Sequence, residues 1–214
     1  MPLTRKGAAT RQRIVEGAAE QIRVQGVFAL RLEDVMAHTA TSKSQLFHYF
    51  PDGKDELLLA VARHEAARVI DDQQPELGSL TSWAAWQRWR DKVVARYRAQ
   101  GTDCPLHTAL AQLGPATDAT RTVAGGLLDR WQQQLAAGIR HLRDAGETDP
   151  DLDPDREAAA LLAGIQGGVL ILLTTGATTH LEAALDVGIA RLRGRTGAAV
   201  ENGTGRAARP AVAE

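Results

Sequence analysis

The stretch "TSKSQLFHYF" (residues 41–50) holds three of the chain's nine aromatic residues, although the rest of it is mostly polar. On a helix, Leu46 and Phe50 lie one turn apart and point the same way, so both can anchor the segment to an apolar core. The remaining side chains would then face outward. The pattern therefore predicts a short helix that offers a mixed polar and aromatic surface to a partner.

The sequence on either side of this stretch predicts further helices. Thr10 is placed to cap a helix that Gly26 ends, and Ser42 is placed to cap the helix of the quoted stretch. A Pro-Asp-Gly run then breaks the chain. The predicted helices of this part span residues 10–25, 31–39, 42–49 and 54–70. Two short helices joined by three or four residues, the second rich in polar side chains, are typical of a helix-turn-helix.

The remainder of the chain predicts longer helices and an all-α fold of about nine helices. Abundant Ala and Leu, with almost no β-branched alternation, favour helices over strands. In the body, helices are expected at 80–99, 105–113, 117–145, 155–175 and 178–193. The expected organisation is a flexible arm (1–9), a helix-turn-helix domain (10–54), a connecting helix (55–71), a larger helical body (72–193) and a disordered tail (194–214).

Charge and cysteine content narrow the class of protein. The net charge is −1, but residues 1–54 carry eight Lys and Arg against five Asp and Glu, which suits a head that meets a polyanion. The single cysteine excludes an intrachain disulfide framework and fits a reducing cytoplasm. The basic N-terminus has no apolar stretch after it, so it does not look like a signal peptide. The apolar run at 159–173 is shorter than a membrane span, so we expect a buried helix there.

The outward face of helix 42–49 combines residue types that read DNA. A lysine can bind phosphate or guanine, a glutamine can bond adenine twice, and an aromatic ring can touch a thymine methyl group. Arg11, Arg13 and Lys54 are placed to bind phosphates on either side. The alternative interpretation is an ordinary amphipathic helix whose polar face is only solvated.

Residues 10–70 resemble the DNA-binding head of the tetracycline-repressor (TetR) family of bacterial transcription regulators. The resemblance rests on "TRQRIVEGAAEQIRVQG", "LEDVMAHTATSKSQLFHYF" and "KDELLLAV". It implies that helix 42–49 is the recognition helix, with Leu46 and Phe50 in the core. The DNA contacts expected from the residues and the resemblance together are Arg11, Arg13, Arg31, Lys43, Ser44, Gln45, Phe47, His48, Tyr49 and Lys54.

The chain departs from the family pattern at several positions. Ala40 stands where glycine is common, at a cost of about 1 kcal/mol if the backbone there is left-handed. Thr41 replaces the usual apolar turn residue, and Phe47 lacks the hydroxyl of the more common tyrosine. Arg31 stands where a small hydroxyl residue often caps the second helix. Gly53 lengthens the connection after the recognition helix, as in the drug-responsive repressors of the family.

The last two helices are predicted to form the dimer interface. Palindromic operators require two heads held about 34–36 Å apart or a multiple of that distance. The run at 159–173 is apolar nearly all round, and its glycines allow close helix approach, which suits a four-helix bundle across a twofold axis. The alternative is that this helix is central in the monomer core. The predicted interface residues are Leu161, Leu162, Ile165, Val169, Leu181, Leu185, Ile189 and Leu192.

The body is also expected to hold a small-molecule cavity. Tryptophans at helical spacing are more often core residues, but with a few polar points they can line an apolar cavity. The predicted lining is Trp83, Trp86, Cys104, His107, Leu110, Trp131, Gln166, Leu170 and Thr174. Cys104 and His107 have no further ligand at metal-site spacing, so we expect no metal and no cofactor.

The resemblance implies a homodimeric transcriptional regulator, a repressor by the family's usual mode, that binds a palindromic operator. An apolar or aromatic inducer in the body would release it through the helix at 54–70. No motif of nucleophilic, metallo- or nucleotide-dependent catalysis is present, so we do not expect an enzyme. The alternative is a non-transcriptional DNA-binding adaptor or ligand-binding protein on the same scaffold.

Overall fold

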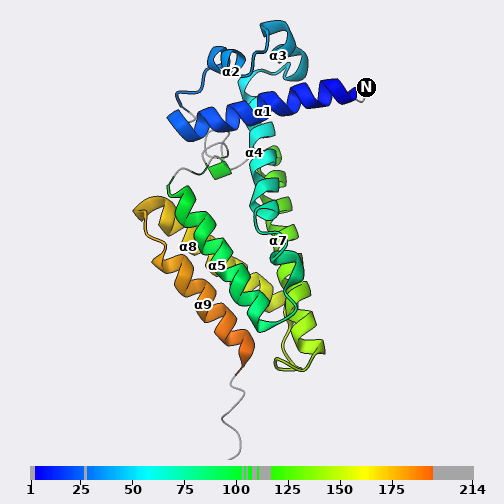
Figure 1. The fold of residues 1–214 in the computed structure, drawn as a ribbon, viewed down its shortest axis with the longest axis vertical. Helices are drawn as coiled ribbons and strands as arrows, with labels where there is room; N and C mark the ends of the chain where they lie inside the picture. The colour runs from blue at the N-terminus through cyan, green and yellow to red at the C-terminus, as the bar shows by residue number, and fades with distance from the viewer. Residues whose placement is uncertain are drawn as a thin grey trace, which may run out of the picture.

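The structure, a computed structural model, describes residues 3–26, 28–102, 104, 106–107, 110 and 117–194. These residues form eight α-helices, one 3-10 helix and no strand, as the all-α prediction requires. In Figure 1 the first three helices gather at one end of the molecule, α4 leads away from them, and the later helices form a longer body. The predicted helix at 105–113 and the tail lie wholly or largely outside the described residues.

The head comprises α1 (Arg5–Gln25), α2 (Leu32–His38) and α3 (Lys43–Tyr49). Helix α1 begins five residues before Thr10, because Thr4 caps it by accepting a bond from the Gly7 amide at 3.2 Å. The prediction that Thr10 is the cap is wrong, as is the flexible arm over residues 5–9. The Thr10 hydroxyl instead donates to the Lys6 carbonyl inside the helix.

The head has a compact apolar core that fixes α3 on α1 and α2. Leu46 and Phe50 are fully buried with Ile14 and Val35, which confirms the predicted anchoring of the quoted stretch. At Gly17 a Cβ atom would lie 2.3 Å from the Cγ2 atom of Thr39, so only glycine allows α1 and α2 to approach this closely.

Helix α4 (Lys54–Asp71) links the head to the body. It packs on α1 at one end and on α7 (Asp118–Asp144) further along. The 3-10 helix η1 (Leu77–Ser79) leads into α5 (Trp83–Gln100), and α8 (Pro154–Thr175) and α9 (Thr179–Arg193) complete the body. The figure shows α4 running down from beneath α1 beside α7 (Figure 1).

Helix α8 packs between α7 and α9. It has 22 residues, close to the predicted 155–175, and by length and composition alone it could cross a membrane. One face of α8 nevertheless lies against α9 inside the protein. A Cβ atom at Gly168 would lie 2.5 Å from the Leu181 Cα atom, and one at Gly188 the same distance from a Leu161 methyl group. The glycines do allow close helix approach, but within one chain.

The eight residues predicted to form the dimer interface are buried inside the monomer, and none exposes more than 8% of its surface. They lie on α8 and α9, which pack directly against each other. That prediction is therefore wrong, and the alternative of a monomer core holds for these residues. Because α8 is apolar on more than one face, hydrophobic periodicity could not identify the side that meets α9. Away from this packed side, α8 exposes Leu170 (59%) and α9 exposes Val187 (69%).

Candidate nucleic-acid interface and ligand cavity

Helix α3 begins with a complete capping box. The Ser42 hydroxyl accepts a bond from the Gln45 amide at 3.2 Å, and the Gln45 side-chain oxygen accepts one from the Ser42 amide at 3.1 Å. These two bonds satisfy backbone donors that the first turn leaves free, and so define where α3 starts. The predicted Ser42 cap is confirmed. The Gln45 side chain, predicted to read a base, has this structural task as well.

The outer face of the head carries most of the predicted DNA contacts. Seven of them are exposed: Arg13, Arg31, Lys43, Ser44, Gln45, Phe47 and His48. Phe47 is 38% exposed, so part of its surface is accessible from outside. Five of the seven lie on α3, on its exposed surface away from the buried Leu46 and Phe50. The arrangement is a helix that exposes a cation, an amide group and a ring on its outer side.

The other three predicted contacts are engaged within the head. The Lys54 ammonium donates to the Leu30 carbonyl at 2.9 Å, which ties the start of α4 to the segment before α2. The Arg11 guanidinium lies 5.0 Å from the centroid of the Phe50 ring. Tyr49 is half-buried, and its hydroxyl lies 3.4 Å from the Cβ position of Gly7. These three residues hold the recognition helix α3 in position, and this role does not depend on a phosphate contact.

The turn between α2 and α3 explains two departures from the family pattern. Ala40 has a φ of 48°, so its backbone is left-handed and the cost of about 1 kcal/mol applies. Thr41 is buried, yet its hydroxyl exchanges bonds with the Thr39 hydroxyl and carbonyl. Arg31 precedes α2 without a side-chain cap bond, as expected. A hydrogen-bonded threonine pair therefore holds this turn in place of an apolar residue.

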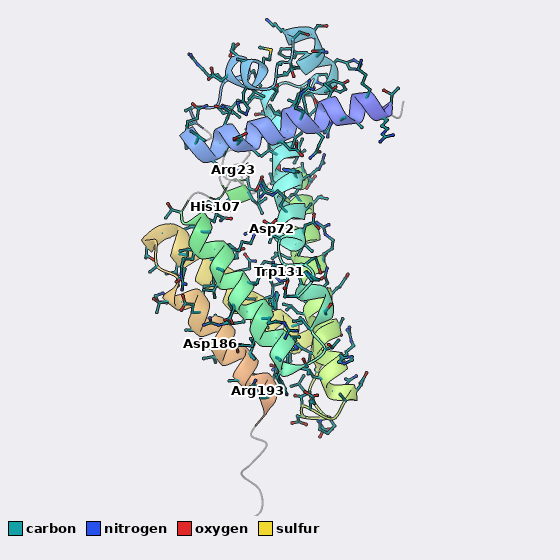
Figure 2. All side chains as sticks on the ribbon, in the orientation of Figure 1. Arg23, Asp72, His107, Trp131, Asp186 and Arg193 are labelled. Carbon is teal, nitrogen blue, oxygen red and sulfur yellow. The ribbon has the colours of Figure 1, made fainter. Side chains whose placement is uncertain are left out.

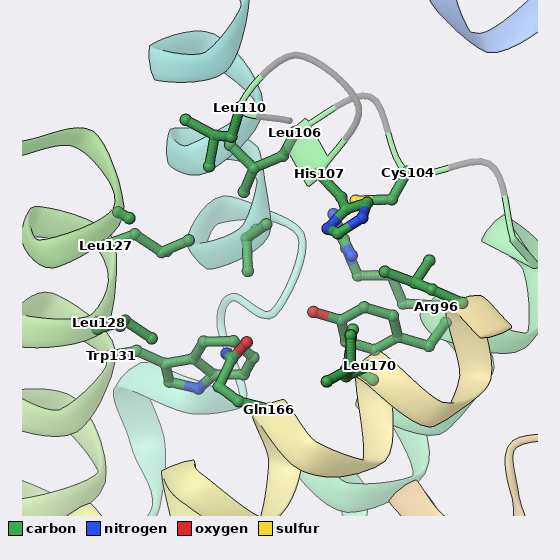
Figure 3. A pocket seen from close by; sticks show the side chains of 15 residues that line it. Arg96, Cys104, Leu106, His107, Leu110, Leu127, Leu128, Trp131, Gln166 and Leu170 are labelled. Carbon is green, nitrogen blue, oxygen red and sulfur yellow. The ribbon is translucent and has the colours of Figure 1, made fainter. Parts of the chain in front are cut away.

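A cavity of about 220 Å³ lies in the body between α4, α5, α7 and α8. Figure 3 shows Trp131, Leu127 and Leu128 on one side of it, Leu106 and Leu110 above, and Arg96, Cys104 and His107 on the far side. Six predicted residues line it: Cys104, His107, Leu110, Trp131, Gln166 and Leu170. An engineered cavity of about 150 Å³ is known to accept benzene, so this one suits a ligand of one ring or slightly more.

Three residues predicted for the cavity lie elsewhere. Trp86 is fully buried beside Trp89, with the two rings 5.6 Å apart and edge to face. Trp83 lies at the start of α5, under the Arg193 guanidinium at 5.1 Å. Thr174 is exposed and bonds to the Leu170 carbonyl. The tryptophan spacing on α5 therefore indicates core packing, as the alternative interpretation held, and only Trp131 of α7 reaches the cavity.

Sequence reasoning missed the two polar residues that α5 contributes to the cavity, Arg96 and Tyr97. Burial raises the pKa of the Tyr97 phenol to about 12, so this hydroxyl is neutral at physiological pH. Burial also raises the pKa of the Cys104 thiol, which is therefore protonated. Arg96 is the charged member of the pair, and its Nε atom donates to Asp72 at 3.1 Å.

A line of ion pairs joins this cavity to the head. Asp72, at the end of α4, lies 3.1 Å from Arg96 and 3.9 Å from Arg68. Arg68 lies 3.4 Å from Glu65, and Glu65 lies 3.0 Å from Arg23 of α1. Figure 2 shows the two regions it connects, with Arg23 beneath α1 and Asp72 near the level of the cavity. We call these five residues the ion-pair line.

Fold and site together define a helix-turn-helix protein with a ligand-sized cavity in a separate helical body. Two family models match the chain: "Bacterial regulatory proteins, tetR family" over residues 14–61, and "Tetracyclin repressor-like, C-terminal domain" over residues 82–187. The chain belongs to the TetR family and is a DNA-binding transcriptional regulator.

Individual proteins resemble the chain in sequence or in fold. The chain is 28% identical over 178 residues to the HTH-type transcriptional regulator Rv0196 of Mycobacterium tuberculosis, covering 76% of this chain and 82% of the relative. A TetR transcription regulator from Haloarcula marismortui has the same fold, with a TM-score of 0.72, 20% identity, and coverage of 86% of this chain and 97% of that one. A transcriptional regulator from Saccharomonospora viridis, solved in complex with choline, gives a TM-score of 0.63 at 23% identity, covering 86% and 96%.

Proposed function

We propose that this regulator is a cytoplasmic repressor that binds a palindromic operator as a homodimer and leaves it when a small molecule enters the body cavity. The observation that carries the proposal is the exposed face of α3. Its lysine, glutamine and phenylalanine are held outward by a capped helix whose inner face is buried. Such a face is suited to base contacts in the major groove.

Within this face the residues have different tasks. Lys43 and His48 are exposed and can meet phosphate or a base edge, and Phe47 can touch a thymine methyl group. Arg13 is exposed on α1 and lies beside the α2–α3 turn. Arg13 and the turn residue Ala40 line the same surface hollow. We assign phosphate contact to Arg13 and Lys43. Lys54, Arg11 and Tyr49 act mainly by holding α3 and α4 in position.

For the dimer, we propose the outer face of the α8–α9 pair. Leu170 and Val187 are the large apolar side chains it exposes, and small residues flank them at helical spacing. The face is formed by Ala160, Ala163, Gly167, Leu170, Thr174, Ala183, Val187 and Ala190. Small side chains let two such pairs approach closely, and a second copy would bury the exposed leucine and valine.

Ligand and operator are coupled, in this proposal, through α4 and the ion-pair line. A ligand that fits the cavity better in one arrangement of α4 shifts the distance between the two heads. Linkage then requires that operator binding weaken ligand binding by the same factor. Leu170 lines the cavity and also lies on the proposed dimer face. The cavity is therefore close to α4 and to the dimer face, the two elements that would set the distance between the heads.

The test is a footprint of the purified protein on DNA of its own genome, followed by transcription from the bound promoter. A repressor protects a site that overlaps a promoter, lowers transcription in vitro, and releases it when a ligand of the cavity is added. Protection without any effect on transcription would instead identify a DNA-bound adaptor.

A further inference from the structure

The charges at and near the cavity have a positive excess. The ion-pair line contains three guanidinium groups and two carboxylates, so it carries one excess positive charge. Its cavity end is an arginine: Arg96 belongs to the lining, whereas its partner Asp72 does not. No aspartate or glutamate is found among the described residues that line the cavity. The field inside therefore favours an anion.

Arg96 retains capacity to bind a ligand. Its side chain is only 14% exposed, so water competes little for it. Its bonds to Asp72 and Gln100 use the Nε and Nη1 atoms, and Nη2 has no protein partner in the part of the chain that the structure describes. A guanidinium can hold carboxylates on two edges at once because its donors are fixed in a fork.

The rest of the cavity suits an apolar ligand body and disfavours a cation. The Tyr97 phenol and the Cys104 thiol are neutral, and most of the lining is leucine, valine and tryptophan. An ammonium ligand would meet Arg96 with no lining carboxylate to offset it, and such a buried like-charge contact is costly. An apolar ring or branched chain would fill the leucine-rich side.

We propose that the ligand is a small carboxylic acid, bound as the carboxylate to Arg96 with its apolar part between Trp131 and the leucines of α7. This inference rests on the proposed function for the existence of a ligand but assigns its chemical class from the lining alone. The carboxylate shares the Arg96 guanidinium with Asp72 and offsets the excess charge of the ion-pair line. Asp72 is then less tightly held by Arg96 and turns toward Arg68.

The experiment compares acids with neutral and cationic molecules of the same shape. The full-length protein is titrated calorimetrically at neutral pH with benzoate, benzamide and benzylamine, then with 3-phenylpropanoate and its amide. Arg96→Met removes the charge, and Arg96→Lys keeps it. Arg90→Met is the matched control, because Arg90 is a similarly buried arginine of α5 that pairs with Asp186 at 2.7 Å and does not line the cavity.

We expect at least one acid to bind the wild-type protein ten or more times tighter than its amide. Arg96→Met should remove that preference, with little change for the amide, while Arg96→Lys keeps part of it and Arg90→Met all of it. Equal binding of acid and amide, tightest binding of the amine, or a preference for acids that survives in Arg96→Met would overturn the proposal. So would the failure of every acid to bind.

Operator binding by the same ligand-free preparation separates the two proposals. If the operator is bound but no acid is, the ligand class is wrong and DNA binding stands. If acids bind at Arg96 but no DNA sequence is recognised, the proposed repressor function fails and the ligand class survives.

Discussion

Replacing Glu65 by glutamine tests whether the ion-pair line couples the cavity to the head. The Glu65 carboxylate is 6% exposed and accepts a bond from Arg23 of α1 at 3.0 Å, with Arg68 at 3.4 Å. A charge-assisted hydrogen bond contributes roughly 1.5–3 kcal/mol. Arg23 and Arg68 are 36% and 41% exposed and regain hydration in the variant. We therefore expect a loss of about 1–2 kcal/mol, which lowers Tm by about 2–8 °C in a domain of this size.

The functional consequence is measured by operator anisotropy with and without a cavity ligand. Allosteric coupling typically amounts to about 5–150-fold in affinity. In Glu65→Gln we expect ligand to bind normally but to change operator affinity less than about 2-fold, because the ion pair between α1 and α4 is lost. Thermal and urea unfolding give the stability change in the same preparation.

Glu157→Gln is the control for stability alone. Glu157 is 11% exposed and pairs with Arg191 at 2.7 Å between α8 and α9, far from the head along the chain. It should lower stability to a similar extent and leave the ligand response intact. If Glu65→Gln retains a full ligand response, or if both variants lose it equally, the ion-pair line does not carry the coupling.

Three further predictions concern single elements. Gln45→Glu should keep the Ser42 capping box and thermal stability but weaken operator binding. Gln45→Ala should lose the bond from the Ser42 amide, some stability, and about 1–3 kcal/mol of operator affinity. Equal operator affinity in Gln45→Glu and wild type contradicts this. The raised pKa of Tyr97 means that the folded protein holds this proton more tightly than the unfolded chain, so its contribution to stability is full below pH 10 and is lost as pH rises toward 12. Tyr97→Phe should remove that loss in alkaline unfolding curves and one late step in phenolate absorbance. Val187→Asp and Leu170→Asp should each give folded monomers in sedimentation at concentrations where we expect the wild type to be dimeric. Dimers in both variants would exclude the proposed face.

The sequence predicted most helix boundaries of the head because these boundaries are set locally. Ser42, Gly26 and the Pro-Asp-Gly run each stop or start a helix by their own backbone preferences. Leu46 and Phe50 could be assigned to the core from spacing alone. The start of α1 was missed because Thr4 and Thr10 are both competent caps, and Gly7 between them, a poor helix former, favours the later start.

The body was harder to predict because the inner and outer faces of its helices do not differ clearly in polarity. Helix α8 is apolar on both sides, so spacing could not show which side meets α9. Arg96 was missed for a different reason: a charged residue on an amphipathic helix looks solvated. Its role depends on Asp72, which lies 24 residues away in sequence. Lys54 likewise looked like a free phosphate ligand, until the fold placed the Leu30 carbonyl beside it.

Selection of bound DNA from a random pool examines the recognition helix α3 and the proposed dimer in one measurement. We expect enrichment of an inverted repeat whose half-sites lie one or more helical turns apart, about 34–36 Å or a multiple of it. In Gln45→Ala the same repeat should emerge with one or two positions relaxed. Enrichment of no sequence, or of a single unpaired half-site, would contradict a dimeric operator-binding regulator.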